Sequence, residues 1–293
     1  MSMRDARHPK AGPEHRAAAR RTSAADEAPL LRVDGMSKAF GPREVVSRVS
    51  FTLAAHELVA LLGPSGAGKT TLFRCFTGLL APDAGRVVFE GTATARQRGG
   101  RRPMAIVFQD YNLVRRLTAL ENVLGGRLGH VAAWRGILRR FERADKLKAF
   151  ECLERVGMLD HAHERADRLS GGQQQRVAIA RALAQEARII VADEPVASLD
   201  PASAAGVLQL LRNIARSDGV AVICSLHQVG YARTFADRII GLSGGRIVMD
   251  ARTDELSDRD YEELYAANSP LDGVMLAGPH PQQESMSSAQ VSL

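Results

Sequence analysis

Runs of hydrophobic residues without polar alternation recur along the chain, and glycine or polar residues bound each one. Such runs are typical of strands in a parallel sheet that is covered on both faces. Three of them predict buried strands at residues 58–62, 189–192 and 220–224. Segments with helical periodicity predict helices at residues 70–77, 173–184 and 202–215. The sequence therefore predicts an α/β fold.

Further elements flank this predicted core. Residues 31–33 and 45–53 read as strands of a small antiparallel β layer. Near the end of the chain, residues 239–242 and 246–249 flank a Ser-Gly-Gly turn, which predicts a β-hairpin. The pattern from about residue 112 to residue 169 is mostly helical, and we expect an inserted helical lobe there.

The two ends of the chain lack hydrophobic periodicity. Residues 1–29 are rich in Ala, Arg, Pro and acidic residues, which predicts a disordered arm. Residues 268–293 are similar in character, and we expect a flexible tail. One folded domain is therefore predicted over residues 30–267.

Composition limits the class of protein. The chain has 293 residues, of which 45% are hydrophobic and 25% charged, as in ordinary globular proteins. No hydrophobic run approaches the roughly 18 residues of a membrane span, and residues 1–21 lack the hydrophobic region of a secretory signal. The three cysteines are far apart and form no CxxC pair, so we expect reduced, buried thiols.

Charge is distributed unevenly along the chain. Lys and Arg number 39 against 33 acidic residues, a formal net charge of +6. Residues 86–140 hold eleven arginines, no lysine and three acidic residues, so this segment alone carries +8. Aromatic residues make up 5%, which is few for base stacking, and we expect no nucleic-acid partner. A surface that faces a membrane or a partner protein is the favoured interpretation.

One segment fits the phosphate-binding pattern GxxxxGK[ST] completely and lies between a predicted strand and a predicted helix. It reads Gly63, Pro64, Ser65, Gly66, Ala67, Gly68, Lys69, Thr70. Its glycines allow backbone N–H groups to turn toward an anion, and the helix points its positive end at the same phosphates. Lys69 adds a full charge at the β- and γ-phosphates, Thr70 presents a hydroxyl to Mg²⁺, and Thr71 is placed to bind the α-phosphate.

Two acidic residues, Asp193 and Glu194, end the strand predicted at residues 189–192. A carboxylate at this edge of a sheet, beside the phosphate loop, is placed to hold Mg²⁺, and we predict this role for Asp193. Glu194 would point to the opposite side and act as general base on an attacking water. By themselves, two acids at a strand end are most often surface residues; the phosphate loop favours the catalytic interpretation.

A Leu-Ser-Gly-Gly-Gln string, here called the LSGGQ segment (residues 169–173), lies at the start of the helix predicted at residues 173–184. Ser170, Gly171 and Gly172 would offer backbone amides and a hydroxyl to an anion. A simple helix cap explains the five residues equally well. The string alone therefore leaves both interpretations open, and its place between the phosphate loop and the acidic pair decides between them.

In this order of motifs the chain resembles the ATP-binding cassette (ABC) ATPases over roughly residues 30–250. The shared features are the phosphate loop, Gln109 after a hydrophobic run, the LSGGQ segment, the acidic pair, Ser-Leu-Asp at residues 198–200, and His227 after a strand. The resemblance implies a P-loop NTPase core with a small antiparallel β layer and an inserted helical lobe. It also implies ATP and Mg²⁺ as ligands.

The resemblance implies a role for each matched residue. Phe40 corresponds to the aromatic residue that stacks on adenine, although by itself it would read as a core residue. Gln109 corresponds to a residue that reaches Mg²⁺ and the attacking water, and His227 to one that contacts the γ-phosphate. Asp200 lies in a segment that contacts the partner subunit. The expected catalytic residues are Glu194, His227 and Gln109. The expected metal ligands are Thr70, Gln109 and Asp193.

The resemblance also implies an assembly. The LSGGQ segment of one subunit, here Ser170, Gly171, Gly172 and Gln173, closes over ATP that the phosphate loop of the other subunit holds. Because the chain carries one copy of each motif, a homodimer is expected. Loss of the γ-phosphate opens the dimer. The expected partners are two transmembrane permease subunits and, indirectly, a periplasmic solute-binding protein, with this chain peripheral at the cytoplasmic face of the bacterial inner membrane.

Four segments resemble the phosphonate import ATPases in particular, namely residues 110–124, 129–138, 155–158 and 226–232. Trp134 and Arg135 carry the most weight because they fall in the predicted helical lobe. Phosphonate uptake is therefore expected. Phosphite, another oxyanion or an amino acid stays open as the solute, because the ATPase subunit does not bind it. A non-transport ABC protein is less favoured because the chain has one cassette, and LSGGQ argues against a P-loop kinase.

Overall fold

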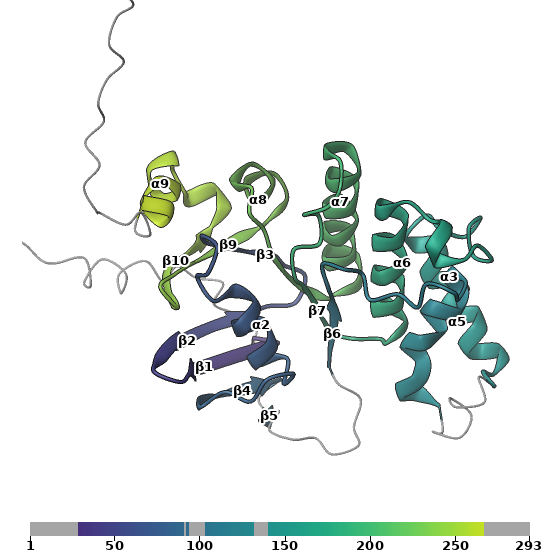
Figure 1. The fold of residues 1–293 in the computed structure, drawn as a ribbon, viewed down its shortest axis with the longest axis horizontal. Helices are drawn as coiled ribbons and strands as arrows, with labels where there is room; N and C mark the ends of the chain where they lie inside the picture. The colour runs from purple at the N-terminus through teal and green to yellow at the C-terminus, as the bar shows by residue number, and fades with distance from the viewer. Residues whose placement is uncertain (1–28, 91, 94–102, 132–139, 267–293) are drawn as a thin grey trace, which may run out of the picture.

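The computed structural model describes residues 29–90, 92–93, 103–131 and 140–266. It contains two β-sheets and the helices that cover them (Figure 1). The predicted arm, apart from Pro29, and the predicted tail fall outside the described residues. The Trp134-Arg135 pair falls outside them as well.

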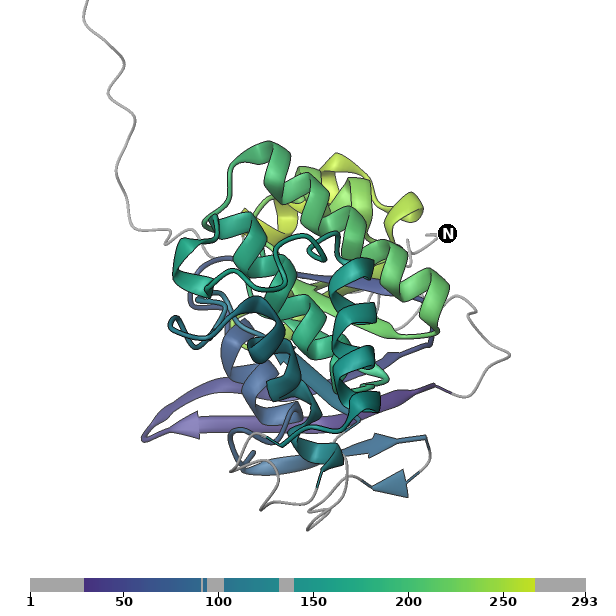
Figure 2. The ribbon, with the colours of Figure 1, turned by 90° about the vertical axis from the view of Figure 1, so that its right-hand side faces the viewer.

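The smaller sheet is antiparallel and has the strand order β2-β1-β4-β5. Its strands are β1 (Leu31–Phe40), β2 (Arg43–Leu53), β4 (Ala84–Phe89) and β5 (Thr92–Ala93). β1 extends beyond the predicted strand at residues 31–33. The prediction stopped short because register shifts between Val33 and Met36 interrupt the alternation around Gly35. Figure 2 shows β1 and β2 as a layer beneath the helical part.

The larger sheet has the strand order β10-β9-β3-β8-β7-β6. All neighbours pair in parallel except β10, which pairs antiparallel with β9. Its strands are β3 (Leu58–Leu62), β6 (Met104–Val107), β7 (Ile189–Ala192), β8 (Ala221–Ser225), β9 (Arg238–Ser243) and β10 (Arg246–Arg252). The three predicted buried strands and the predicted hairpin are confirmed as β3, β7, β8 and the β9–β10 pair.

The central strands of the larger sheet are almost entirely hydrophobic because they separate two cores. Every residue of β3, β7 and β8 is buried. On β3, Val59 and Leu61 belong to the core shared with the antiparallel sheet, whereas Ala60 and its neighbours Leu58 and Leu62 belong to the core under the helices. This two-sided burial explains why the sequence of these strands shows no polar alternation.

The helix α2 (Lys69–Phe76) lies between the parallel sheet and the antiparallel sheet. Its buried face includes Leu72, Phe73 and Phe76. The Phe76 ring makes edge contacts with Phe51 of β2 at 5.7 Å and with Phe73 at 5.5 Å. This packing holds the start of α2 at the end of β3, where the phosphate loop lies.

A group of helices covers the other face of the parallel sheet (Figure 1). It comprises α3 (Ala119–Leu124), the 3₁₀ helix η1 (Gly125–His130), α5 (Arg143–Arg155), the 3₁₀ helix η2 (Ala166–Arg168), α6 (Gly171–Ala184) and α7 (Pro201–Asp218). α6 and α7 contain the helices predicted at residues 173–184 and 202–215. α6 packs against α3 and α5, so the LSGGQ segment begins a helix that belongs to this group.

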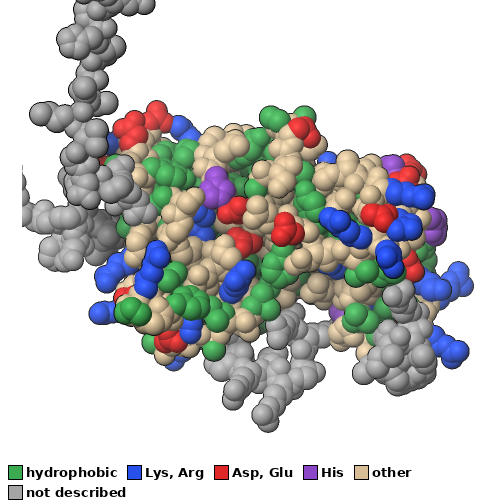
Figure 3. All heavy atoms as spheres, in the orientation of Figure 1, with side chains coloured by type: hydrophobic (Ala, Val, Ile, Leu, Met, Phe, Trp, Pro, Cys, Tyr) green, Lys and Arg blue, Asp and Glu red, His purple; other side chains and the backbone are tan. Residues whose placement is uncertain are grey.

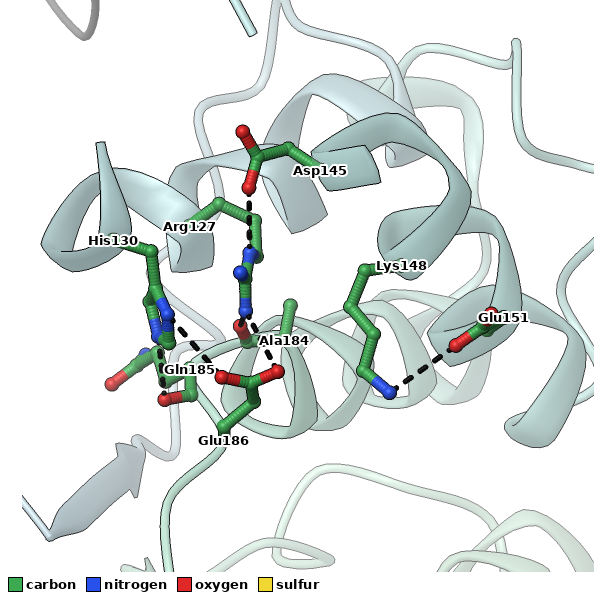
Figure 4. A network of polar contacts seen from close by, with 8 residues as sticks. All are labelled: Arg127, His130, Asp145, Lys148, Glu151, Ala184, Gln185 and Glu186. Atoms are coloured by element: carbon green, nitrogen blue, oxygen red, sulfur yellow. Dashed lines mark hydrogen bonds and ion pairs between the residues drawn. The ribbon is translucent and has the colours of Figure 1, made fainter. Parts of the chain in front are cut away.

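Polar contacts tie η1 to α5 and to the end of α6 (Figure 4). Arg127 donates to Asp145 at 3.0 Å and to the carbonyl of Ala184 at 3.0 Å, and it pairs with Glu186 at 3.3 Å. The ring of His130 lies 3.1 Å from the carbonyl oxygen of Gln185. The Arg127 and Asp145 side chains are nearly buried, at 11% and 9% exposure, so their charges are paired where solvent cannot screen them.

The chain continues after β8 through α8 (Val229–Phe235), and after β10 through the 3₁₀ helix η3 (Thr253–Glu255) and α9 (Asp258–Ala266). Tyr261 and Leu264 of α9 are buried against the core under the helices. Among the helices of the described ranges, none has the length and hydrophobicity needed to cross a membrane.

Candidate active site

The phosphate loop joins the end of β3 to the start of α2. Gly63 and Gly68 have positive φ angles of 151° and 102°, which residues with a side chain rarely adopt. A Cβ on Gly63 would lie 2.1 Å from the carbonyl oxygen of Leu242, and one on Gly68 would lie 2.6 Å from that of Val45. The path of the loop therefore requires glycine at both positions.

Lys69, the first residue of α2, points its side chain back into the loop. Its Nζ donates to the carbonyl oxygens of Gly63 at 2.6 Å and Pro64 at 3.2 Å. Burial lowers the pKa of Lys69, and the nearby carboxylates of Glu194 and Asp193 oppose that shift. A largely buried ammonium inside a loop at a helix N-terminus is suited to pair with a phosphate oxygen.

Asp193 lies just after β7 and is held by two hydroxyls. Ser225, the last residue of β8, donates from Oγ to Asp193 Oδ1 at 2.8 Å. Thr70 Oγ1 lies 3.4 Å from the same oxygen. The Ser225 Oγ also accepts from the backbone N–H of Glu194 at 2.8 Å. β7 and β8 are parallel neighbours, which brings these residues to one edge of the sheet.

A hydroxyl and a carboxylate oxygen at this edge are the hard oxygen ligands that Mg²⁺ prefers. No group of three or more His, Cys, Asp or Glu side chains with the geometry of a metal site occurs within the described part of the chain. Mg²⁺ at a nucleotide site takes one or two oxygen ligands from the protein and completes its shell with phosphate oxygens and water. Thr70 and Asp193 therefore fit the ion that the sequence predicts.

Glu194 contacts His227, whereas Asp193 contacts Ser225 and Thr70. The φ angle of Glu194 is +50°, and its Oε1 lies 2.6 Å from Nε2 of His227. The two side chains line a hollow together with Ser225 and Tyr231. Figure 3 shows acidic side chains and a histidine close together in the region of β3, β7 and α8. The arrangement places a carboxylate and an imidazole in contact at a solvent-accessible site.

Gln109 and Phe40 are both exposed residues that follow or end a strand. Gln109 is exposed in the loop that follows β6. Phe40 is the last residue of β1 and is 52% exposed, so it is not a core residue. The Nζ of Lys38 lies 5.7 Å from the centre of its ring. An exposed aromatic ring offers a face for stacking.

The LSGGQ segment starts α6 with a capping box. The Ser170 Oγ accepts from the backbone N–H of Gln173 at 3.3 Å, and the Gln173 Oε1 accepts from the backbone N–H of Ser170 at 2.9 Å. The first helical bond runs from Gln174 N–H to the Ser170 carbonyl. The amides of Gly171 and Gly172, in the first turn, therefore have no partner inside the helix and can receive an anion.

Asp200 caps α7. Its Oδ1 accepts from the backbone N–H groups of Ala202 at 3.1 Å and Ser203 at 3.0 Å. Hydrogen bonds from Ser203 hold the pKa of Asp200 below its usual value. A capping role accounts for an aspartate at this position, and contact with a partner subunit stays a prediction.

The structure brings together part of the predicted site. The loop at residues 63–70 and the residues Thr71, Asp193, Glu194 and His227 lie around the same edge of the larger sheet. The LSGGQ segment lies elsewhere: in Figure 1, α6 and α2 are on opposite sides of β7 and β6. Between residues 63–70 and 169–173, all described, there is no hydrogen bond or ion pair.

Two residues with clear roles in this geometry were not predicted. Ser225 carries the contacts to Asp193 and Glu194. Arg181 of α6 donates to the carbonyls of Tyr111 at 2.9 Å and Asn112 at 2.6 Å, next to Gln109. The signal for Ser225 was available, because it is a polar residue at the end of a hydrophobic run. Arg181 gave no comparable signal among the many arginines.

Comparisons with known proteins agree with this geometry. The sequence profile described as ABC transporter matches residues 46–197. The chain is 51% identical over 240 residues to the hypophosphite import ATP-binding protein HtxD of Stutzerimonas stutzeri, covering 80% of this chain and 70% of that protein. It is 46% identical over 249 residues to the phosphonates import ATP-binding protein PhnC of Frankia casuarinae, covering 83% and 98% of the two chains.

Solved structures share the fold. The chain superposes on the ADP conformation of MJ1267, an ATP-binding cassette of an ABC transporter, with a TM-score of 0.73 and 27% identity over 83% of this chain and all of that one. It also resembles the dimeric structure of MJ0796, a bacterial ABC transporter cassette, with a TM-score of 0.65 and 30% identity over 76% and 98% of the two chains. From its motifs, its site and these relatives, the chain belongs to the ABC transporter family, as an ATP-binding cassette.

Proposed function

We propose that this chain is the ATP-hydrolysing subunit of a bacterial importer that takes up a phosphonate or a related phosphorus oxyanion through a separate permease. The observation that carries the ATPase chemistry is the convergence of Lys69, Thr70, Asp193 and the Glu194–His227 pair at one edge of the sheet. The relatives named for hypophosphite and phosphonate import support the solute class.

The phosphate loop and Lys69 would bind the phosphates of ATP through backbone N–H groups and one positive charge. Thr70 and Asp193 would hold Mg²⁺, which neutralises charge on the β- and γ-phosphate oxygens when bound. Ser225 keeps Asp193 in place through its hydroxyl. Phe40 would stack on the adenine.

Glu194 would orient the attacking water and accept its proton as general base. His227 lies within hydrogen-bonding distance of this carboxylate, so it would fix the direction of the carboxylate and contact the γ-phosphate. Gln109, in the loop after β6, would reach Mg²⁺ and the same water. A rigid carboxylate and imidazole pair supports hydrolysis because positioning is the main requirement of phosphoryl transfer.

The LSGGQ segment would act on the ATP of a second copy. Within the described part of one chain no hydrogen bond or ion pair joins it to the phosphate loop, and its first-turn amides have no partner inside the helix. A head-to-tail homodimer would supply that anion as the γ-phosphate of the partner's ATP. The dimeric relative MJ0796 supports this assembly. Two permease subunits would bind the dimer at the cytoplasmic face of the membrane, and a solute-binding protein would deliver the solute to them.

Glu194→Gln tests the ATPase part of the proposal. The variant keeps the shape of the side chain and loses the base, so hydrolysis should fall at least about a hundredfold while ATP still binds. Chromatography with ATP and Mg²⁺ should then show a stable dimer, and the same variant with Lys69→Ala should stay monomeric. A monomer at saturating ATP would contradict the two-copy site.

The solute is tested in cells that depend on the importer. Deleting the chain should abolish growth on a phosphonate, or on hypophosphite, as sole phosphorus source, and wild type but not Glu194→Gln should restore it. Co-purification with a permease supports the importer role. Unchanged growth on every phosphorus oxyanion, with lost uptake of an amino acid, would assign a different solute to the same ATPase.

A further inference from the structure

A histidine outside the predicted site contacts the LSGGQ segment. His161 lies in the turn after α5, and its Nε2 is 3.3 Å from Nε2 of the Gln173 side chain. Its other nitrogen, Nδ1, is 3.1 Å from Oε2 of Glu164. Gln173 is the residue whose Oε1 completes the capping box of α6. His161 therefore lies between the carboxylate of Glu164 and the side chain of Gln173, which caps the first turn of α6.

The hydrogen bonds determine which atom carries a proton. A carboxylate accepts, so Nδ1 of His161 is the protonated nitrogen that donates to Glu164. In the neutral ring Nε2 is then an acceptor, and the amide NH₂ of Gln173 donates to it. This leaves Gln173 Oε1 free to accept from the backbone N–H of Ser170. Donors and acceptors match at every step of this series of hydrogen bonds from Glu164 to Ser170, so each bond orients the next.

Any other proton arrangement breaks this match. If Nε2 of His161 carries a proton, two donors face each other unless the Gln173 amide turns over. A turned amide would point its NH₂ at the N–H of Ser170. The capping box would then lose the hydrogen bond from the Ser170 N–H to the Gln173 side chain. Glu164 is the charged group in contact with His161 among the described residues; Arg165, beside it, is paired with Asp167.

We propose that His161 is a positioning residue for the LSGGQ segment: its neutral ring fixes the Gln173 amide and thereby holds the first turn of α6 ready for the partner's ATP. This inference rests on the proposed role of that segment in a two-copy site. It connects the turn after α5 to the LSGGQ segment through a side chain that has no proposed contact with a nucleotide. His161 is 37% exposed, so solvent protons reach it.

Two substitutions separate the hydrogen bond from the packing. His161→Leu fills the space but accepts no hydrogen bond. His161→Gln offers an amide oxygen that can accept from Gln173 and does not titrate. His163→Gln is the matched control, because His163 is exposed two residues away and its ring lies by Phe150 instead. ATP binding to the monomer, measured with a fluorescent analogue, should be equal in all of them.

In the Glu194→Gln background, His161→Leu should weaken ATP-driven dimerisation about fivefold per site, roughly 25-fold for the two sites of a dimer, the size expected for one lost hydrogen bond at each. His161→Gln should restore the dimer to within about twofold, and His163→Gln should leave it unchanged. Sedimentation equilibrium at fixed ATP and Mg²⁺ measures the dissociation constants.

The pH profile provides the second readout, which packing alone would not move. With Glu194 intact, the ratio of wild-type turnover to His161→Gln turnover should fall by about fivefold or more from about pH 8 to about pH 5.5, where imidazoles gain a proton. His227 and Glu194 are present in both proteins, so their contributions to turnover cancel in the ratio. A ratio that stays flat overturns the inference, even if His161→Leu fails to fold.

The outcomes also separate this inference from the proposed function. If Ser170→Ala weakens the dimer and His161→Leu does not, the two-copy site stands and the role of His161 is refuted. If Ser170→Ala and His161→Leu both leave the dimer unchanged, the LSGGQ segment has no role in trans, and the inference falls together with that part of the proposed function.

Discussion

At the scale of single residues, Ser225 is the group on which the two acids of the site depend. It is fully buried, and its one hydroxyl donates to Asp193 and accepts from the backbone N–H of Glu194. The neighbouring strand β8 therefore holds the carboxylate of Asp193 and the backbone of Glu194. Burial makes these bonds consequential, because a buried donor without an acceptor costs about 1–3 kcal/mol.

Ser225→Ala should therefore reduce turnover at saturating ATP roughly tenfold and raise the Mg²⁺ concentration needed for half-maximal activity, because Asp193 loses its anchor. Steady-state ATPase assays over a Mg²⁺ titration measure both. Ser257→Ala is the matched control, since it removes a serine–aspartate bond of 2.6 Å at the start of α9, far from the site in the sequence. Equal Mg²⁺ dependence in the two variants would contradict the role of Ser225.

At the scale of elements, α6 carries more than the LSGGQ segment at its start. Farther along it, Arg181 holds the carbonyls of Tyr111 and Asn112, two residues with positive φ angles of 59° and 48°. Burial lowers the pKa of Arg181. Arg181 thus connects the loop after Gln109 to α6, the helix that Ser170 caps, and a shift of α6 would move this loop with it.

Arg181→Lys should weaken the contact between α6 and this loop, because an ammonium cannot reproduce the two hydrogen bonds that the planar guanidinium donates to the two carbonyls. We expect a loss of about 1–3 kcal/mol in the free energy of unfolding and a several-fold lower turnover. Denaturant titration and ATPase assays test this. Arg188→Lys, at an exposed ion pair with Glu90, should change stability by less than about 0.5 kcal/mol; a similar loss in both would refute the assignment.

At the scale of the whole molecule, the parallel sheet separates two cores, and the three cysteines are divided between them. Cys75 belongs to the core around α2, and Cys152 and Cys224 to the core under the helices. All three are buried, as the sequence predicts. Burial raises the pKa of each thiol, that of Cys224 to about 12, so the reactive thiolate is scarce near neutral pH.

The native protein should therefore react with a thiol reagent such as DTNB only as it opens. At about pH 8 we expect no appreciable release of thionitrobenzoate within minutes, and three equivalents after addition of denaturant. The denaturant dependence of labelling, followed site by site, reports whether the two cores open together. A thiol that reacts within seconds in the folded protein would show that one core is accessible.

Much of the fold was predictable because hydrophobic pattern and glycine placement act locally. Strands buried on both faces are almost entirely hydrophobic, which allowed β3, β7 and β8 to be predicted from the sequence. β1 was underestimated because a bulge near Gly35 breaks the alternation that reveals a strand. The assignment of α6 to the same helical group as α3 and α5 was also not readable, since helix packing is a contact between distant segments.

The sequence by itself predicted the chemistry of the site, because the phosphate loop is a complete local motif and its order with the acidic pair and the LSGGQ segment gives those two shorter strings their interpretation. The tertiary structure alone decided which distant residues support them. Ser225 contacts Asp193 from the adjacent strand, Arg181 contacts the loop after Gln109, and His161 contacts Gln173. These contacts depend on the register of strands and the packing of helices, which no local pattern encodes.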